Sequence, residues 1–275
     1  MLILLPPSET KRDGGEGAPL EQLLVESALA FPELNAIRKR VVAATVSLAR
    51  KPKVCAEVLK LSPKQMGEVD RNKAVKTSPT MPAIDRYTGV LYDGLGAINL
   101  PAEARTFLGE HVLIQSALLG PVRAVDLIPA YRLSFDSKLP SLAAGTLKKA
   151  WAEASSKALA KRLKEKHQLV LDLRSEGYSA LTPLAPAENT VYLRVVTKGE
   201  NGQLRALNHF NKKGKGEFLR ALAKDAAVTS SLENVEQLIS WAATKNFILE
   251  PGEPATQDWP AELNLVVSGV VKKLC

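Results

Sequence analysis

The turn between two short helical patterns, residues 54–60 and 64–69, carries side chains suited to an anion. Lys60, Ser62 and Lys64 surround Pro63 in this turn. Such a hairpin presents backbone N–H groups and ammonium groups to a phosphate at the start of its second helix. Ser62 is a suitable cap for that helix, with Pro63 in its first position and Gln65 completing a capping box. The alternative is an ordinary capped helix pair with basic faces towards solvent.

A second cluster lies in the apolar stretch 116–133, which contains Arg123, Asp126, Tyr131 and Arg132. Polar groups in such a setting need partners inside the fold or at its edge. Two interpretations stay open. Arg123 and Asp126 form an ion pair that orients a loop, or the arginines form an anion site, with Arg132 as a fork for phosphate or carboxylate.

A third cluster, residues 172–178, follows a predicted strand, where α/β sheets often hold their functional residues. In it, Ser175 is a candidate cleft residue, Glu176 a candidate general base, and Tyr178 a candidate proton donor or stacking surface. The same residues are also compatible with a simple capped strand end. Ser175 does not lie in a Gly-x-Ser-x-Gly setting, so a nucleophilic serine is not indicated.

A fourth cluster, residues 209–216, places Lys212, Lys213 and Lys215 beside two glycines, just before a predicted helix. Amide and ammonium groups there would converge on one anion, unless the segment is only a flexible basic turn. A similar polar loop, residues 6–17, follows the first predicted strand and contains Ser8 and Lys11. It lacks the spacing of a phosphate-binding or dinucleotide-binding loop.

Metal and cofactor chemistry has little support in the sequence. His111, His167 and His209 show no mutual ligand spacing, so we predict no metal site and no cofactor, although a carboxylate iron site stays open. Cys55 and Cys275 have no paired spacing, which favours a reducing, cytoplasmic location. No run reaches about 18 apolar residues, so we expect no membrane association.

The predicted elements that position these clusters alternate between strands and helices. A continuous apolar run predicts a buried strand at 2–5, and further candidate strands lie at 83–92, 111–119 and 169–173. An Asn-Gly pair at 201–202 predicts a β-hairpin from 191–197 and 204–210. Helical spacing is found at 20–29, 34–48, 147–163, 217–223 and 235–243. No repeat or low-complexity linker divides the chain, so we expect one intertwined mixed α/β unit over 1–275, with a central sheet and surrounding helices.

The net charge of +8 is concentrated in one segment. Residues 36–76 hold eleven basic and three acidic residues, so 11 − 3 = +8 lies there and the remainder of the chain sums to zero. This basic helical hairpin segment suits a phosphate-rich partner, and the alternative is that the charge only keeps the protein soluble. We expect a monomer that binds duplex or distorted DNA.

Several segments, taken in order, resemble the bacterial peroxide-stress protein YaaA family. They are residues 1–11, 86–95 (Arg-Tyr-Thr-Gly-Val-Leu-Tyr-Asp-Gly-Leu), 116–133, 173–178 and 209–216. The departures are Leu119, Ala124, and Lys60 and Ser62 in place of two hairpin glycines. The resemblance implies a cytoplasmic α/β protein with an unusual fold, a basic cleft, a helix-hairpin-helix element and DNA binding, which limits oxidative DNA damage when peroxide meets iron. The implied cleft residues are Lys11, Arg132, Ser175, Glu176, Lys212, Lys213 and Lys215, with Lys60, Ser62 and Lys64 at the hairpin.

Two functions therefore compete, and the sequence does not establish whether any reaction is catalysed. The first is DNA binding through backbone phosphates. The second is an enzyme acting on a nucleotide, a damaged base or another small phosphorylated ligand, for which Ser8, Arg132, Glu176, Tyr178 and Lys213 would have to converge on one pocket. Direct iron sequestration is a third, weaker hypothesis.

Overall fold

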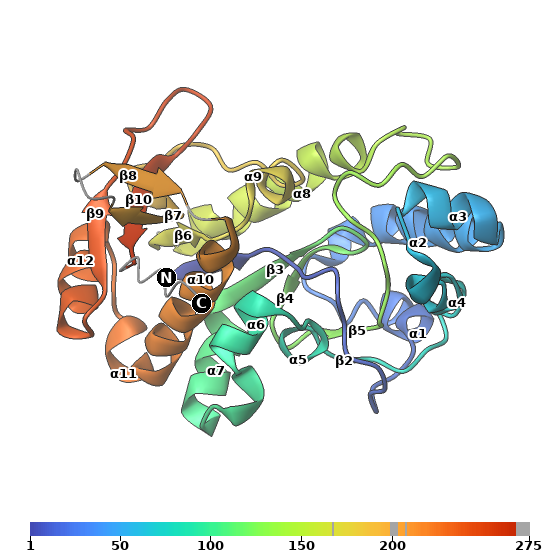
Figure 1. The fold of residues 1–275 in the computed structure, drawn as a ribbon, viewed down its shortest axis with the longest axis horizontal. Helices are drawn as coiled ribbons and strands as arrows, with labels where there is room; N and C mark the ends of the chain where they lie inside the picture. The colour runs from blue at the N-terminus through green and yellow to red at the C-terminus, as the bar shows by residue number, and fades with distance from the viewer. Residues whose placement is uncertain (167, 199–202, 207, 268–275) are drawn as a thin grey trace, which may run out of the picture.

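The computed structural model describes residues 1–166, 168–198, 203–206 and 208–267, and the chain is built around one mixed sheet (Figure 1). The strand order is β4-β3-β1-β6-β7-β10-β9, with β8 paired to β7. Strands β3, β1, β6, β7 and β10 are parallel, whereas β4, β8 and β9 are antiparallel to their neighbours. The strands are β1 Leu2–Leu5, β3 Val112–Ser116, β4 Gly120–Arg123, β6 Val170–Asp172, β7 Thr190–Lys198, β8 Leu204–Ala206, β9 Ile248–Pro251 and β10 Ala261–Val266. A separate pair joins β2 Met81–Pro82 to β5 Leu127–Ile128.

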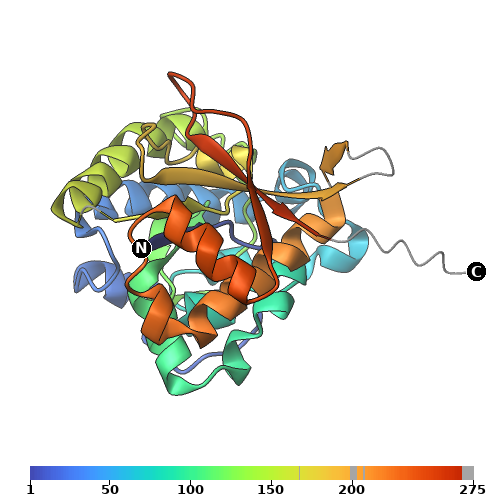
Figure 2. The same ribbon diagram turned by 90° about the vertical axis from the view of Figure 1, so that its left-hand side faces the viewer.

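Helices cover both faces of the sheet. The α-helices are α1 Leu20–Val25, α2 Asn35–Ala49, α3 Pro52–Val58, α4 Gly67–Lys73, α5 Ala83–Arg86, α6 Val90–Leu95, α7 Ala102–His111, α8 Leu147–Lys166, α9 Glu176–Ser179, α10 Asn208–Lys224, α11 Ala226–Thr229 and α12 Val235–Thr244. Short 3-10 turns lie at Pro32–Leu34, Pro63–Gln65 and Ala97–Asn99. The C-terminal elements α11, α12, β9 and β10 lie together on the side that faces the viewer in Figure 2. No helix in the described residues is long and apolar enough to span a membrane.

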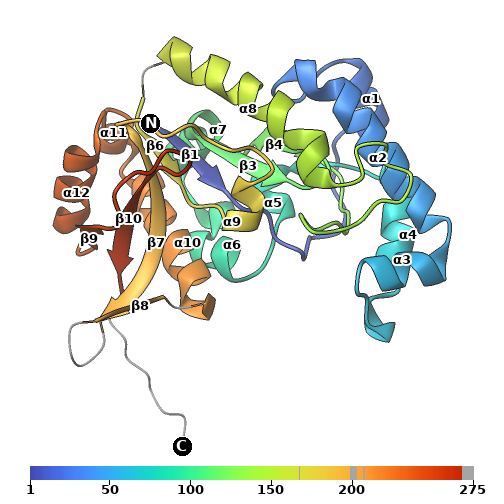
Figure 3. The same cartoon turned by 90° about the horizontal axis from the view of Figure 1, so that it is seen from above.

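Strand β1 is buried on both faces, as its continuous apolar run predicts. Because side chains alternate along a strand, Leu2 and Leu4 pack in a small cluster with Leu159 of α8, whereas Ile3 and Leu5 belong to the main core. Figures 1 and 3 show the sheet between α8 and the pair α6 and α10. The predicted mixed α/β class with a central sheet and surrounding helices is confirmed.

The predicted hairpin at 191–210 is confirmed in part. Strands β7 and β8 are antiparallel, with Val196 opposite Ala206, whereas the Asn-Gly turn lies outside the described residues. The second strand ends at Ala206, and α10 begins at Asn208.

The predicted strand at 83–92 is wrong, because this segment forms α5 and α6. Ala83, Ile84, Tyr87 and Leu91 are among its buried residues, and they follow a helical spacing rather than a strict alternation. Gly89, with φ +96°, separates the two helices.

The prediction that 209–216 is a loop before a helix is also wrong, because these residues lie inside α10. The glycines serve helix packing. A Cβ on Gly216 would lie 2.0 Å from the carbonyl oxygen of Leu91, and a Cβ on Gly94 would lie 2.9 Å from that of Lys213. The backbones of α6 and α10 therefore approach closely at Gly94 and Gly216, and these glycines are packing positions inside helices rather than residues of a flexible loop.

Candidate functional site

The carboxyl ends of β1 and β6 meet at one edge of the sheet, beside Tyr192 in the first half of β7, since Leu4 pairs with Asp172 and Asp172 with Tyr192. A cavity of about 920 Å³ lies at this edge, where open α/β sheets commonly bind ligands. It is lined by residues 6–10, 88–92, 134–135, 173 and 175–178, and by Tyr192, Arg194, Lys212 and Lys215.

Three of the predicted clusters contribute to this cavity. The first-strand loop, the segment after β6 and helix α10 come from distant parts of the chain and meet there. The predicted site residues on its lining are Ser8, Ser175, Glu176, Tyr178, Lys212 and Lys215. Sequence spacing alone gave no distances between these segments, whereas the sheet register brings them together.

Helical geometry selects which lysines of α10 reach the cavity. Lys212 and Lys215 are three residues apart and share a helix face. Lys213 is not on the lining, and its Nζ lies 3.5 Å from a carboxylate oxygen of Glu217, one turn further along the helix. The predicted convergence of backbone amides with all three lysines is therefore wrong. Inside α10 the backbone N–H groups are bonded within the helix, and the helical spacing directs Lys213 away from Lys212 and Lys215.

Lys215 is a buried lysine on the cavity wall. Its Nζ donates to the carbonyl oxygen of Leu173 at 3.0 Å and lies 5.3 Å from the centre of the Tyr192 ring. Burial lowers the pKa of Lys215 to about 8, against the opposing effect of Asp172. An amine of this kind is partly neutral near physiological pH.

Lys11 lies under the cavity loop rather than on the cavity lining. Its Nζ donates to the carbonyl oxygens of Ser8 and Glu9, at 2.8 and 3.2 Å, and lies 4.1 Å from the centre of the Tyr131 ring. Burial lowers the pKa of Lys11 to about 7. Lys11 therefore fixes the backbone of the loop that carries Ser8.

The tyrosine beneath Lys11 is itself held in a buried hydroxyl network. The hydroxyl of Tyr131 lies 2.8 Å from that of Tyr87 and 2.7 Å from Ser116 Oγ. Ser116 Oγ also accepts from the backbone N–H groups of Leu118 and Leu119. Burial raises the pKa of Tyr131, so the network is neutral and anchors the floor beneath the loop.

Sequence reasoning missed Tyr192 and Arg194. These residues are two positions apart on β7, so their side chains lie on the same face of the strand. Arg194 donates to Glu176 at 3.1 Å, pairs with Glu262, and lies 5.2 Å from the centre of the Tyr192 ring. Hydrogen bonding to Glu262 raises the pKa of Arg194. One oxygen of Glu176, the predicted general base, is therefore already bonded. The Tyr-x-Arg pattern on a strand was the available signal.

Arg132 lies in a neighbouring hollow of about 340 Å³ rather than on the cavity lining. Its guanidinium pairs with Glu9, and Glu9, Ser134 and Phe135 line both spaces. Lys60, at the hairpin turn, lines the same hollow. The hollow thus lies between the hairpin and the cavity.

Arg123 does not belong to the cavity. It lies opposite Leu113, near the amino end of β3 and therefore away from the carboxyl ends that form the site. Its Nε donates to Asp126 at 2.8 Å, and the second oxygen of Asp126 accepts from the backbone N–H groups of Arg123 and Ala30. Of the two interpretations, the geometry favours the ion pair that orients a loop.

The hairpin turn has the expected side chains on its surface. Lys60, Ser62 and Lys64 are exposed, and Lys60 has a φ of +53°, in the left-handed region that favours glycine. The backbone N–H and Oγ of Ser62 both donate to Gln65 Oε1, each at 3.0 Å. The second arm begins as a 3-10 turn, Pro63–Gln65, before α4. The Ser62 amide is thus occupied within the turn.

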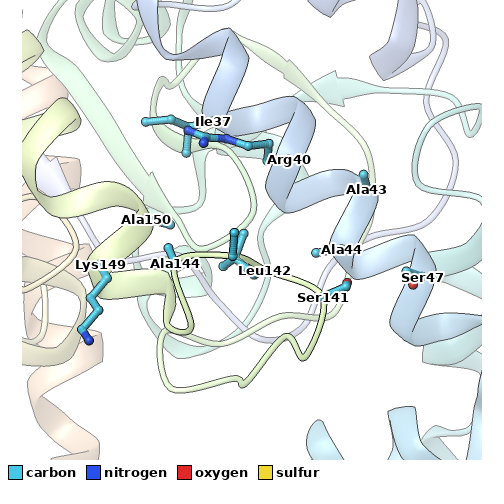
Figure 4. Close-up of a pocket in the computed structure, with 11 residues that line it drawn as sticks. Ile37, Arg40, Ala43, Ala44, Ser47, Ser141, Leu142, Ala144, Lys149 and Ala150 are labelled. Carbon is cyan, nitrogen blue, oxygen red and sulfur yellow. The ribbon is translucent and has the colours of Figure 1, made fainter.

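Another hollow, of about 520 Å³, lies between α2, α8 and residues 141–144. Figure 4 shows small side chains such as Ala43, Ala44 and Ala150 around it, with Lys149 pointing away. None of the predicted site residues lines it. In the described part of the chain, no group of three or more His, Cys, Asp or Glu residues could hold a metal ion, and His167, His209 and Cys275 fall outside the residues whose side chains are described.

Comparison with known proteins places these features in one family. A family model described as peroxide stress protein YaaA matches residues 1–250. A UPF0246 protein of Corynebacterium glutamicum strain R is 40% identical over 251 residues, which cover 90% of this chain and 96% of the relative. A UPF0246 protein of Streptomyces coelicolor is 36% identical over 273 residues, which cover 98% of this chain and 100% of the relative. The match extends across the cavity, the hollow and the hairpin, and the chain belongs to the peroxide stress protein YaaA family.

Proposed function

We propose that this member of a peroxide stress family binds DNA through backbone phosphates and thereby limits iron-dependent oxidative damage. Its membership of that family is consistent with a role in the stress response. The observation that carries the proposal is the surface of the helical hairpin segment, residues 36–76, which holds the entire net charge of the chain. The hairpin turn also adjoins the hollow that leads to the cavity.

Most cations of this segment are available to a partner. Arg38 is buried and donates to backbone carbonyls, and Arg71 pairs with Asp13 and Glu68. Seven exposed cations have no carboxylate partner among the described residues: Lys39, Arg40, Arg50, Lys51, Lys53, Lys64 and Lys76. Exposed ammonium and guanidinium groups without partners are suited to phosphates, because binding releases the condensed counterions.

The hairpin supports binding by side chains more than by backbone amides. The N–H of Ser62 is bonded to Gln65, so it is not free for a phosphate. Lys60 pairs with Asp136 at 3.1 Å, but its side chain is 81% exposed, so the ammonium keeps access to solvent. We therefore expect Lys60 and Lys64 to contact phosphates without reading bases.

The test is the binding of a fluorescently labelled duplex, followed by anisotropy over a range of salt concentrations. The double change Lys60→Glu/Lys64→Glu should weaken binding to all sequences similarly and reduce the log–log salt slope by about two units. The matched control is Lys157→Glu/Lys161→Glu on α8, which makes the same change in net charge at exposed positions. Equal losses from both double variants, or affinity that does not depend on salt, would contradict the proposal.

The protective role needs its own measurement. Supercoiled plasmid is exposed to ferrous iron and peroxide with the wild-type protein or with the Lys60→Glu/Lys64→Glu variant, and nicking is followed on a gel. If protection depends on DNA binding, the variant should protect less at equal concentration. Equal protection by both proteins would show that protection of the plasmid does not depend on DNA binding by the hairpin.

The cavity favours a second function, an enzyme acting on a nucleotide, a damaged base or another phosphorylated molecule. Of the five residues expected to converge for this function, Ser8, Glu176 and Tyr178 line the cavity, whereas Arg132 and Lys213 do not. Tyr178 and Tyr192 offer aromatic surface beside the cations Arg194, Lys212 and Lys215. Calorimetric titration with a nucleoside monophosphate and with a sugar phosphate tests this second function. Binding that Lys212→Met leaves unchanged would argue against the cavity as the phosphate site.

A further inference from the structure

Lys215 differs from a lysine that only supports the fold. The residue is only 5% exposed, yet it lies on the wall of the large cavity. The bond to the carbonyl of Leu173 is its one hydrogen bond to the described residues. An ammonium group has three protons, so this bond leaves capacity unused.

Lys11 provides the contrast within the same molecule. It is also buried, but its Nζ is bonded to two carbonyl oxygens and lies against the Tyr131 ring, and it is not on the cavity lining. Burial lowers the pKa of both lysines, to about 7 for Lys11 and about 8 for Lys215. Only Lys215 combines a partly neutral amine with direct contact to the cavity. A desolvated lysine in a pocket is a typical nucleophile towards carbonyl groups.

The charges around Lys215 indicate which charged group would be present on a carbonyl compound that binds in the cavity. Glu176 pairs with Arg194, and Glu9 pairs with Arg132. Lys212 shares the helix face of Lys215 and has no carboxylate partner among the described residues. The ammonium group of Lys212 lies about one helical turn from Lys215, and it would bind a phosphate of the same compound.

We propose that Lys215 forms an imine with the aldehyde carbon of a phosphorylated sugar whose phosphate is bound by Lys212. The neutral amine attacks the carbonyl carbon and forms the new C–N bond. The carbonyl oxygen leaves as water with two hydrogen atoms from the amine, so no oxidant or reductant is needed. The inference deepens the second function proposed for the cavity and does not depend on DNA binding by the hairpin.

Two sources present the same chemistry, a free sugar phosphate and an abasic site in DNA. The experiment therefore has two arms, 2-deoxyribose 5-phosphate and a duplex with a single abasic site, each incubated with the full-length protein and cyanoborohydride. The reductant converts an imine into a stable secondary amine, and peptide mass mapping locates it. Lys215→Arg, which keeps the charge but removes the nucleophile, is compared with Lys213→Arg, which changes a lysine outside the cavity. Binding of an undamaged duplex is measured in parallel.

We expect the trapped adduct on Lys215 in at least one arm, with a loss of tenfold or more in Lys215→Arg and no change in Lys213→Arg. A signal in one arm only identifies the source of the aldehyde. No adduct in either arm, or adducts spread over exposed lysines, would overturn the proposal. Mapping on the wild-type protein gives this answer even if Lys215→Arg does not fold, and the undamaged duplex reports separately on DNA binding.

Discussion

Two glycines of α10 should respond differently to the same substitution by alanine. A Cβ on Gly216 would lie 2.0 Å from the carbonyl oxygen of Leu91, whereas real Cβ contacts essentially never fall below 3.0 Å, so α6 and α10 must separate by about 1 Å. A Cβ on Gly214 would meet only the side chains of Val195 and Val267, at 3.4 and 3.5 Å, which is ordinary contact.

The magnitude follows from two effects. Replacing glycine by alanine inside a helix stabilises it by about 1 kcal/mol, and this gain is common to both variants. Overpacking against backbone destabilises by about 1–3 kcal/mol and applies only to Gly216. We therefore expect Gly214→Ala to be neutral or stabilising, and Gly216→Ala to be less stable than Gly214→Ala by about 1–3 kcal/mol.

The assay is urea unfolding of both variants and the wild type, followed by circular dichroism. Because α10 carries Lys212 and Lys215, we also expect Gly216→Ala to reduce trapping of an aldehyde on Lys215. A Gly216→Ala variant as stable as Gly214→Ala would refute the close approach of α6 and α10.

Three further measurements test the electrostatics and the cavity wall. Because burial lowers the pKa of Lys215 to about 8, folding favours its neutral form, so its contribution to stability rises as the pH increases. Linkage gives about 1.4 kcal/mol between pH 7 and pH 9, and Lys215→Met should lose this part of the pH dependence in urea unfolding. Asp126→Ala should destabilise by about 2 kcal/mol in the same assay, because it leaves the part-buried N–H of Ala30 and the guanidinium of Arg123 without an acceptor; a loss under 1 kcal/mol would contradict this role. Gly177→Ala would place a Cβ 2.4 Å from the Phe135 ring, so we expect Phe135 to move and ligand affinity of the cavity to change with little loss of stability, as measured by calorimetry and thermal unfolding.

The strands and the longer helices were accessible from local patterns. The short apolar run at 2–5 and the mostly apolar segment 169–173 indicate buried strands, and the period of 147–163 is helical, so these elements could be predicted without tertiary information. The prediction for 83–92 was wrong because its short apolar groups are compatible with the period of a strand and with that of a helix. Packing against the rest of the fold stabilises helices α5 and α6 instead. The prediction that Lys212, Lys213 and Lys215 lie in a loop was wrong because glycines are typical of loops, whereas Gly214 and Gly216 lie within the packed helix α10.

The sequence by itself determined the mixed α/β class, the family and the concentration of charge in residues 36–76, since each depends on residue types and their order. Only the tertiary structure decided which candidate residues share a site. It brought Ser8, Glu176 and Lys215 to one cavity and placed Arg123 at the other end of the sheet. The physical reason is that strand register and helix facing depend on contacts between distant segments, and local spacing does not encode those contacts.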